Sequence, residues 1–254
     1  MRMNDVKILS IDWDYFQNVK KEIIRKCYPD GIDMPTDLST IIWASKYAAF
    51  PDLKQNATLR ADEYQILTKI LKKQSTAIPV TIVNSHMYAY DFVKNISDKH
   101  HTKIELVNVD MHHDIVNNND ELDCGNWIQH LIENHYIKSP IIKSLKWINH
   151  PISFDTYGFL DPDDSQEFKD VIEKINGGTS LSVIENETFD GIFIARSDNW
   201  SPPHLDGYFN KLIKHIFNHF TEVIIEKSVE TQRSEYKQIT ENIRTNYREV
   251  LNKK

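Results

Sequence analysis

Six short apolar runs rich in β-branched residues recur along the chain, and longer stretches with helical spacing separate them. These runs lack apolar and polar alternation, which is typical of strands buried on both faces of a parallel sheet. Alternating strands and helices favour an α/β fold, a three-layer αβα sandwich with a mainly parallel sheet, in a single domain over 1–254. The expected strands are 6–12, 79–86, 103–110, 144–150, 180–185 and 191–197.

Apolar side chains at helical spacing predict the intervening helices. In 62–74, acidic residues near the start and lysines near the end match the helix macrodipole. The stretch 230–251 carries one narrow apolar stripe and predicts a long C-terminal helix. That helix has two interpretations, one packed on the domain surface and one that contacts another subunit of a homo-oligomer. The other expected helices are 87–99, 126–137, 165–175 and 204–220.

Composition argues against several classes of protein. A net charge of −7 argues against a nucleic-acid-binding protein and favours attraction of cations. Cys27 and Cys124 are too few for a disulfide framework and have no zinc-type spacing, which fits a reducing compartment. The sequence contains neither a membrane-length apolar stretch nor a glycine-rich phosphate loop. We therefore expect a cytoplasmic protein that binds neither nucleic acid nor membranes.

Carboxylates and imidazoles stand where four of the predicted strands end. In open parallel sheets, ligands bind outside the carboxyl ends of the strands, so these side chains are expected at one edge. The strongest signal is Asp110-x-His112-x-Asp114, because residues i, i+2 and i+4 of a strand end can point to one side. The complete set of candidate metal ligands is Asp12, Asp14, His86, Asp110, His112 and Asp114.

Four carboxylates and two imidazoles are too many ligands for one first-row ion. They fit two metal ions about 3.5–4 Å apart with shared carboxylates and a bridging water. Mixed oxygen and nitrogen ligands suit Mn²⁺, Fe²⁺ or Zn²⁺ better than Ca²⁺ or Mg²⁺. Without metal, the clustered carboxylates would repel one another. The alternative is that the acidic residues form turns and helix caps and that His86 is a hydrogen-bonded core histidine.

The motif from Asp110 to Asp114 resembles the Asp-x-His-x-Asp element of arginases and related ureohydrolases, which share a fold with histone deacetylases. In those enzymes a further metal-binding histidine lies a little over twenty residues earlier, and His86 is 24 residues before Asp110. Their Ser-x-Asp-x-Asp element resembles Ser10-Ile11-Asp12-Trp13-Asp14. The resemblance is confined to these motifs, within roughly residues 8–205.

Two features of the sequence depart from the pattern of ordinary arginases and restrict the resemblance to one group of these enzymes. In ordinary arginases the Asp-x-Asp pair follows the other motif, whereas here it comes first, which suggests a relocated strand. The segment that binds the carboxylate and amine of free arginine is not recognisable after Asp114. This combination is similar to peptide arginases, maturation enzymes of ribosomally made peptide natural products. They convert arginine residues of a precursor peptide to ornithine and release urea.

The resemblance implies two Mn²⁺ ions on the six ligands and a hydroxide that attacks the guanidinium carbon. Asp114 would also accept a hydrogen bond from the nucleophile. Asp198 is the candidate for binding the guanidinium bidentately, and Asn126 is a second substrate-binding candidate. A histidine would carry a proton to the leaving amine, with His130 ranked above His113. The alternatives are a helix cap at Asp198 and surface histidines.

The sequence is also compatible with two other kinds of function. One is another metal-dependent hydrolase, such as a deacetylase or small-molecule ureohydrolase of the same fold, or a phosphoesterase. The other is a non-catalytic metal-containing protein that binds arginine-bearing peptides. The number of metal ions bound and the turnover of an arginine peptide discriminate among these functions.

Overall fold

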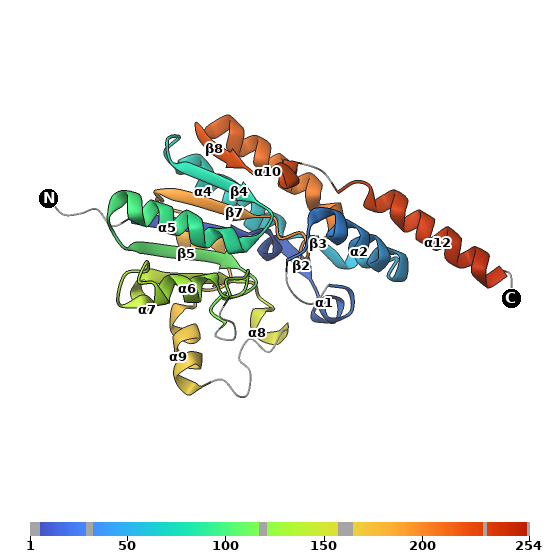
Figure 1. The fold of residues 1–254 in the computed structure, drawn as a ribbon, viewed down its shortest axis with the longest axis horizontal. Coiled ribbons are helices and arrows are strands. Elements are labelled where there is room, and N and C mark those ends of the chain that lie inside the picture. Colours follow the sequence, from blue (N-terminus) through green and yellow to red (C-terminus); the bar gives the residue numbers. More distant parts are fainter. Residues whose placement is uncertain (1–5, 29–32, 117–120, 157–164, 231–232, 253–254) are drawn as a thin grey trace.

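The computed structural model describes residues 6–28, 33–116, 121–156, 165–230 and 233–252. Its centre is a six-stranded sheet in the order β6-β5-β1-β7-β4-β8, and every neighbouring pair is parallel (Figure 1). The strands are β1 (Val6–Asp12), β4 (Pro79–Val83), β5 (Ile104–Asp110), β6 (Leu145–Asn149), β7 (Gly191–Ala195) and β8 (Glu222–Ile225).

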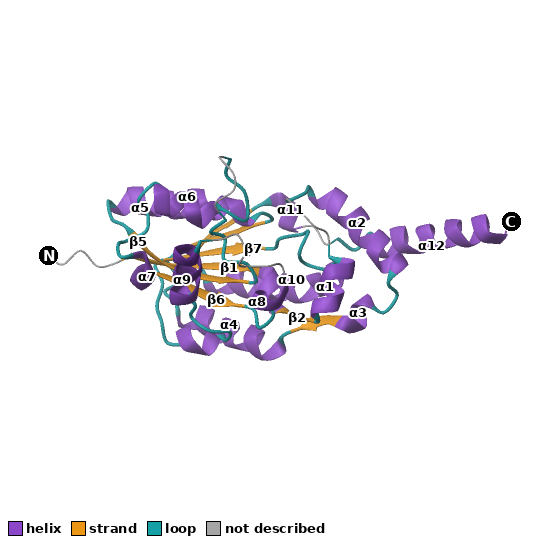
Figure 2. Cartoon of the chain, turned by 90° about the horizontal axis from the view of Figure 1, so that it is seen from below, coloured by secondary structure: helices purple, strands orange, loops and turns teal. Residues whose placement is uncertain are grey.

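Helices cover both faces of the sheet, so the expected three-layer αβα sandwich is confirmed (Figures 1 and 2). On one face, α4 (Ala61–Lys73) and α10 (Asp206–His219) bury apolar side chains against the sheet. On the other face, α5 (Ala89–His100), α6 (Trp127–Glu133) and α9 (Gln166–Ile175) do the same. Apart from the edge strand β8, the strands are therefore largely buried on both sides, as their continuous apolar runs predict.

Five of the six expected strands are confirmed, and 180–185 is wrong: this segment contains the 3-10 helix η3 (Leu181–Ile184). Ser180 Oγ accepts a hydrogen bond from the Ser182 amide, and the Leu181 amide donates to the Glu63 carboxylate. Side chains thus accept hydrogen bonds from amide groups that would have to bond a neighbouring strand if this segment were part of the sheet. The strand β8 lies at the sheet edge and was not expected.

A smaller group of elements packs beyond the central strands. Helices α1 (Lys21–Cys27), α2 (Thr36–Ala49) and α12 (Tyr236–Asn252) share a third apolar cluster, which includes Met111, the residue after β5. The expected helix 230–251 begins at Tyr236, and residues 231 and 232 lie outside the described residues. α12 packs along α2 and then extends past the rest of the molecule (Figures 1 and 2). A role for it in subunit contact stays a prediction.

Short elements complete the chain. β2 (Gln17–Val19) and β3 (Ala57–Leu59) form an antiparallel pair. None of the helices in the described ranges has the length and apolar character that crossing a membrane requires. The remaining elements are η1 (Trp13–Phe16), α3 (Leu53–Asn56), η2 (His86–Tyr88), α7 (Ile141–Ser144), α8 (Ser153–Thr156), η4 (Pro203–Leu205) and α11 (Lys227–Glu230).

Candidate metal centre

The six predicted ligands come from the carboxyl ends of three strands near the middle of the sheet. Asp12 is the last residue of β1 and Asp110 the last residue of β5, which is paired with β1. The chain then turns sharply after β1, because Asp12 Oδ1 accepts a hydrogen bond from the Asp14 amide at 3.1 Å and caps η1. Asp12 therefore has the capping role considered above, and its second oxygen still points into the cluster.

The first group of ligands surrounds Nδ1 of His86, which follows β4. This nitrogen lies 2.9 Å from Asp110 Oδ2, 3.1 Å from Asp114 Oδ2 and 3.4 Å from Asp12 Oδ2. All four side chains are at most 5 % exposed. Three carboxylate oxygens therefore converge on one imidazole nitrogen.

The second group surrounds Nδ1 of His112. This nitrogen lies 3.1 Å from Asp14 Oδ2 and 3.5 Å from Asp110 Oδ1. Asp110 thus presents one oxygen to each group and joins them. The His112 side chain is 22 % exposed, and its ring meets the Trp200 ring edge-on with centroids 4.9 Å apart. The second group is therefore the side of the cluster that opens outward.

Hydrogen bonds from neighbouring side chains fix the orientation of the ligands. Outer contacts of this kind set the tautomer and the direction of metal-binding side chains. The described residues include three such contacts: Ser10 Oγ with His86 Nε2 at 2.7 Å, Trp127 Nε1 to Asp114 Oδ2 at 2.6 Å, and Ser197 Oγ to Asp12 Oδ2 at 2.6 Å. The Trp127 and Ser197 contacts were not expected from the sequence, because they join segments that only the fold brings together.

Two residues of this network have left-handed backbone conformations. Asp114 has φ 55° and Ser197 has φ 49°, a region that non-glycine residues rarely occupy. The Asp114 carbonyl accepts a hydrogen bond from the Ile128 amide at 3.1 Å, which ties this turn to α6. Strained backbone persists where surrounding contacts hold it and is concentrated at functional sites.

Burial and mutual repulsion dominate the electrostatics of the cluster. Burial, together with the charge of Asp110, raises the pKa of Asp114, and burial and the charge of Asp14 raise the pKa of Asp12. Burial alone would raise the pKa of Asp110 too, but the imidazoles of His112 and His86, whose Nδ1 atoms lie 3.5 and 2.9 Å from its oxygens, hold it well below its usual range. The metal-free cluster therefore retains protons, which bound metal ions would displace.

The donor atoms fit a metal ion better than a protonated network. Asp14 Oδ2, His86 Nδ1 and Asp110 Oδ2 are buried, and none of them forms a hydrogen bond with good geometry to the described residues. Buried polar atoms normally have such partners. Two overlapping groups of ligands, Asp12-His86-Asp110 and Asp14-Asp110-His112, can each hold a metal ion. This arrangement is compatible with a metal-dependent hydrolase.

Asp198, the candidate for binding a substrate guanidinium, already holds the chain's own arginine. Arg196 Nε donates to Asp198 Oδ1 at 2.5 Å, and Arg196 Nη2 donates to Oδ2 at 2.9 Å. Arg233 Nη1 lies 3.5 Å from the same Oδ1, and the Asp198 side chain is fully buried. The structure thus gives both carboxylate oxygens internal partners.

The three remaining candidates have contacts of a structural kind. Asn126 bridges its own loop, accepting from the Asp123 amide at 2.7 Å and donating to the Glu121 carbonyl at 2.8 Å. His113 Nδ1 accepts from the Ile115 amide at 3.0 Å, and its ring meets Trp147 edge-on. The His130 ring meets Tyr90 of α5 edge-on, with centroids 6.3 Å apart. Their roles in catalysis and substrate binding stay predictions.

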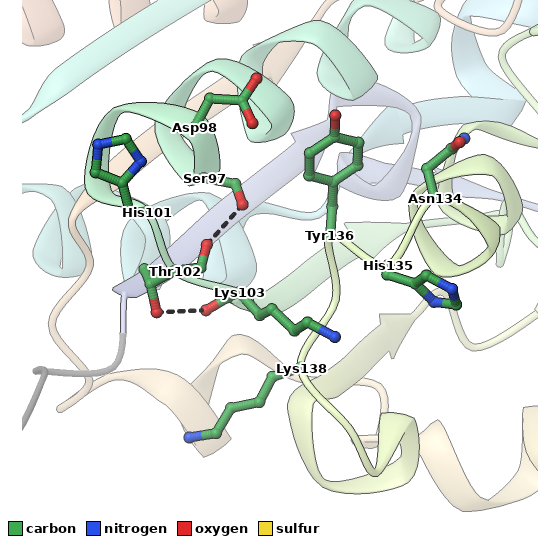
Figure 3. A pocket seen from close by; sticks show the side chains of 9 residues that line it. All are labelled: Ser97, Asp98, His101, Thr102, Lys103, Asn134, His135, Tyr136 and Lys138. Atoms are coloured by element: carbon green, nitrogen blue, oxygen red, sulfur yellow. Dashed lines mark hydrogen bonds between the residues drawn. The ribbon is translucent and has the colours of Figure 1, made fainter.

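The structure also has a cavity of about 750 Å³ (Figure 3). It is lined by the ends of α5 and α6 and by Lys103, which immediately precedes β5, whereas the cluster lies at the opposite end of that strand. Its lining contains none of the predicted site residues.

Comparison of the chain with known protein families, with curated proteins and with solved structures finds no match. The geometry of the cluster is therefore the structural basis for assigning a function.

Proposed function

We propose that this protein is a binuclear manganese hydrolase that converts arginine residues of a precursor peptide to ornithine and releases urea. The observation that supports it is the sharing of Asp110 between the His86 group and the His112 group. A shared carboxylate is the arrangement by which two-metal sites hold their ions close together. The manganese assignment and the peptide substrate follow from the resemblance to peptide arginases in motif and spacing.

The ligands have the charge that two divalent ions need. Four carboxylates carry as much negative charge as two divalent ions carry positive charge. When bound, two such ions would supply a nucleophile from water at neutral pH and stabilise developing charge. Ser10 Oγ is placed to accept a hydrogen from His86 Nε2, which leaves the Nδ1 lone pair directed at the cluster.

Hydrolysis of an arginine guanidinium consumes one water and gives urea and an ornithine ammonium group. The bond between the guanidinium carbon and the side-chain nitrogen breaks, and both protons of the water end on that nitrogen. A group in the site must relay them, and Asp114 is the buried carboxylate proposed to accept the first hydrogen bond from the nucleophile. Trp127 Nε1 donates to Asp114 Oδ2 and fixes the direction of that carboxylate.

Mass spectrometry of an arginine-containing peptide tests this function. The purified protein with Mn²⁺ is expected to decrease the mass of the peptide by CH₂N₂ for each arginine converted, with urea appearing in equal amount. Asp110→Ala removes the shared ligand and is expected to lower the rate at least about a thousandfold, as loss of a metal nucleophile does. Asp98→Asn, an exposed change on α5, is the matched control.

Other outcomes would redirect the assignment. Hydrolysis of free arginine with no change in peptides would contradict a peptide substrate and leave a small-molecule ureohydrolase. Release of acetate from an acetyl-lysine peptide by a protein that binds one metal ion would support a deacetylase. Metal and peptide binding without turnover would support a binding protein.

A further inference from the structure

Ser197 lies in a turn directly after β7, beside the metal centre. Its amide donates a hydrogen bond to the Asn84 carbonyl at 2.8 Å, which continues the contact between β7 and β4 past the ends of both strands. Its hydroxyl donates to Asp12 Oδ2 at 2.6 Å, and both residues are buried. The turn after β7 therefore places a hydroxyl against a metal ligand that belongs to β1.

The backbone of Ser197 is left-handed, with φ 49°. Glycine adopts this conformation without the steric clash that a side chain causes, whereas other residues occupy it at a cost in free energy. A serine at this position thus gives the turn a hydroxyl and a strained backbone together. Strain of this kind persists where the surrounding contacts hold it and where it serves the function of a site.

The residues on either side of Ser197 hold it in this conformation. The side chains of Arg196 and Asp198 are fully buried and form a bidentate pair, with Nε 2.5 Å from Oδ1 and Nη2 2.9 Å from Oδ2. The Asp198 carbonyl accepts three further hydrogen bonds of 2.8 Å, from Ser39 Oγ, Trp43 Nε1 and Arg233 Nη1. The turn therefore cannot relax without breaking several buried contacts.

Through Asp12, Ser197 acts on one of the two groups of ligands. Asp12 Oδ2 lies 3.4 Å from His86 Nδ1, and Oδ1 accepts a hydrogen bond from the Asp14 amide. Both oxygens are thus held, and an oxygen that accepts one hydrogen bond keeps a second acceptor position. Among the described residues, Asp12 belongs to the group with His86 and not to the group with His112. The hydroxyl of Ser197 therefore affects the direction of a ligand in the His86 group alone.

We propose that Ser197 is a positioning residue of the His86 group and that its strained conformation serves to direct Asp12 Oδ2 towards a bound metal ion. The buried pair of Arg196 and Asp198 holds the turn in which Ser197 lies. This inference rests on the proposed function only in requiring a metal ion at the His86 group. It predicts that glycine at position 197 relieves backbone strain and weakens metal binding in the same variant.

Ser197→Gly tests this role, because glycine removes the hydroxyl and accepts the left-handed backbone. Titration of the metal-free protein with Mn²⁺, followed by electron paramagnetic resonance of the unbound ion, measures the affinity. We expect the affinity of one bound ion to fall about tenfold to a hundredfold, the usual effect of removing an outer partner of a metal ligand. His101→Gly is the matched control, because His101 has φ 50° in the exposed C-cap of α5 and should leave Mn²⁺ affinity unchanged.

Two backgrounds show whether Ser197 acts through Asp12. Asp14→Asn impairs the His112 group and leaves the His86 group whole, so adding Ser197→Gly should weaken the remaining ion by the same factor. Asp12→Ala removes the acceptor of the Ser197 hydroxyl, so adding Ser197→Gly should cause no further loss of Mn²⁺ affinity. A role of Ser197 in the fold alone would lower the affinity equally with and without Asp12.

Unchanged Mn²⁺ affinity in Ser197→Gly would overturn the inference. An undiminished loss of affinity in the Asp12→Ala background would also overturn it, because Ser197 would then act through the fold. Turnover of the arginine peptide is measured separately. Weaker Mn²⁺ binding by Ser197→Gly, together with no turnover by the unchanged protein, would contradict the proposed function and support the role of Ser197.

Discussion

At the scale of single residues, the metal centre depends on side chains that never touch the proposed ions. Ser10 is an example: it is buried in β1, and its Oγ lies 2.7 Å from His86 Nε2. This contact fixes which imidazole nitrogen keeps its proton, and the other nitrogen is then available as a ligand.

Ser10→Ala is expected to weaken Mn²⁺ binding about tenfold to a hundredfold, the usual effect of removing an outer partner of a metal-binding histidine. Titration of the metal-free protein with Mn²⁺ measures the change. Ser201→Ala is the matched control, because the Ser201 hydroxyl is equally buried and has no hydrogen-bond partner in the described ranges. Equal metal affinity for Ser10→Ala and the unchanged protein would show that this contact does not orient His86.

His150 makes folding sensitive to pH. Its Nδ1 accepts from the Ile152 amide at 3.2 Å and its Nε2 donates to the Gln17 carbonyl at 2.6 Å, so the folded state needs a neutral ring. Burial lowers the pKa of His150 from 6.5 to about 4. Between pH 6.5 and pH 4, His150 is therefore protonated in the unfolded chain and neutral in the folded chain. The stability that His150 contributes above pH 6.5 is lost as pH falls towards 4.

We expect this residue to remove about 2 kcal/mol from the free energy of unfolding between pH 7 and pH 5. Urea unfolding of the metal-free protein at both pH values, beside His150→Gln, isolates the effect from metal loss. The variant should lose correspondingly less stability on acidification. An identical pH dependence of the two proteins would contradict the account.

At the scale of elements, continuous apolar runs in the sequence predict the buried strands correctly. The prediction is wrong where local hydrogen bonds prevent a strand from forming, and it misses a strand at the edge of the sheet. The run 180–185 has a strand-like composition, yet the side chains of Glu63 and Ser180 accept hydrogen bonds from its backbone amides. The edge strand β8 has only four residues and alternates in exposure, so it lacks the signal of a buried strand. Strands β1 and β5 are confirmed because both faces of each carry helices.

The segment that leads into α12 depends on one buried arginine. Arg233 Nη2 donates to Asp206 Oδ1 at 2.5 Å at the start of α10, and Arg233 Nη1 donates to the Asp198 carbonyl at 2.8 Å. Removing one partner of a buried pair leaves the other charge uncompensated.

Arg233→Met should therefore lower the free energy of unfolding by about 3–5 kcal/mol. Chemical denaturation followed by circular dichroism measures the loss. Arg244→Met on α12 removes the partly exposed pair with Glu241 and one hydrogen bond to the Tyr47 carbonyl, and should cost about 1 kcal/mol. If both variants lost equally little stability, the buried network would not anchor this segment.

At the scale of the whole molecule, the order of the strands creates the site. The sheet places β5, β1, β7 and β4 side by side, so the segments after them meet at one edge although they are far apart in sequence. Strand-end residues could be predicted as ligands because parallel strands share this edge. The contact between Asp198 and Arg233 could not be predicted, because Arg233 reaches Asp198 only through the return of the chain after α10.

The number of manganese ions bound by each chain decides whether the cluster is a two-metal centre. Native mass spectrometry of the protein titrated with Mn²⁺ should show saturation at two ions, and Asp110→Asn should weaken both sites together because Asp110 faces both histidines. Asp14→Asn should weaken one site more than the other, since Asp14 faces only His112. Saturation of the unchanged protein at one ion, or no binding, would contradict a two-metal centre.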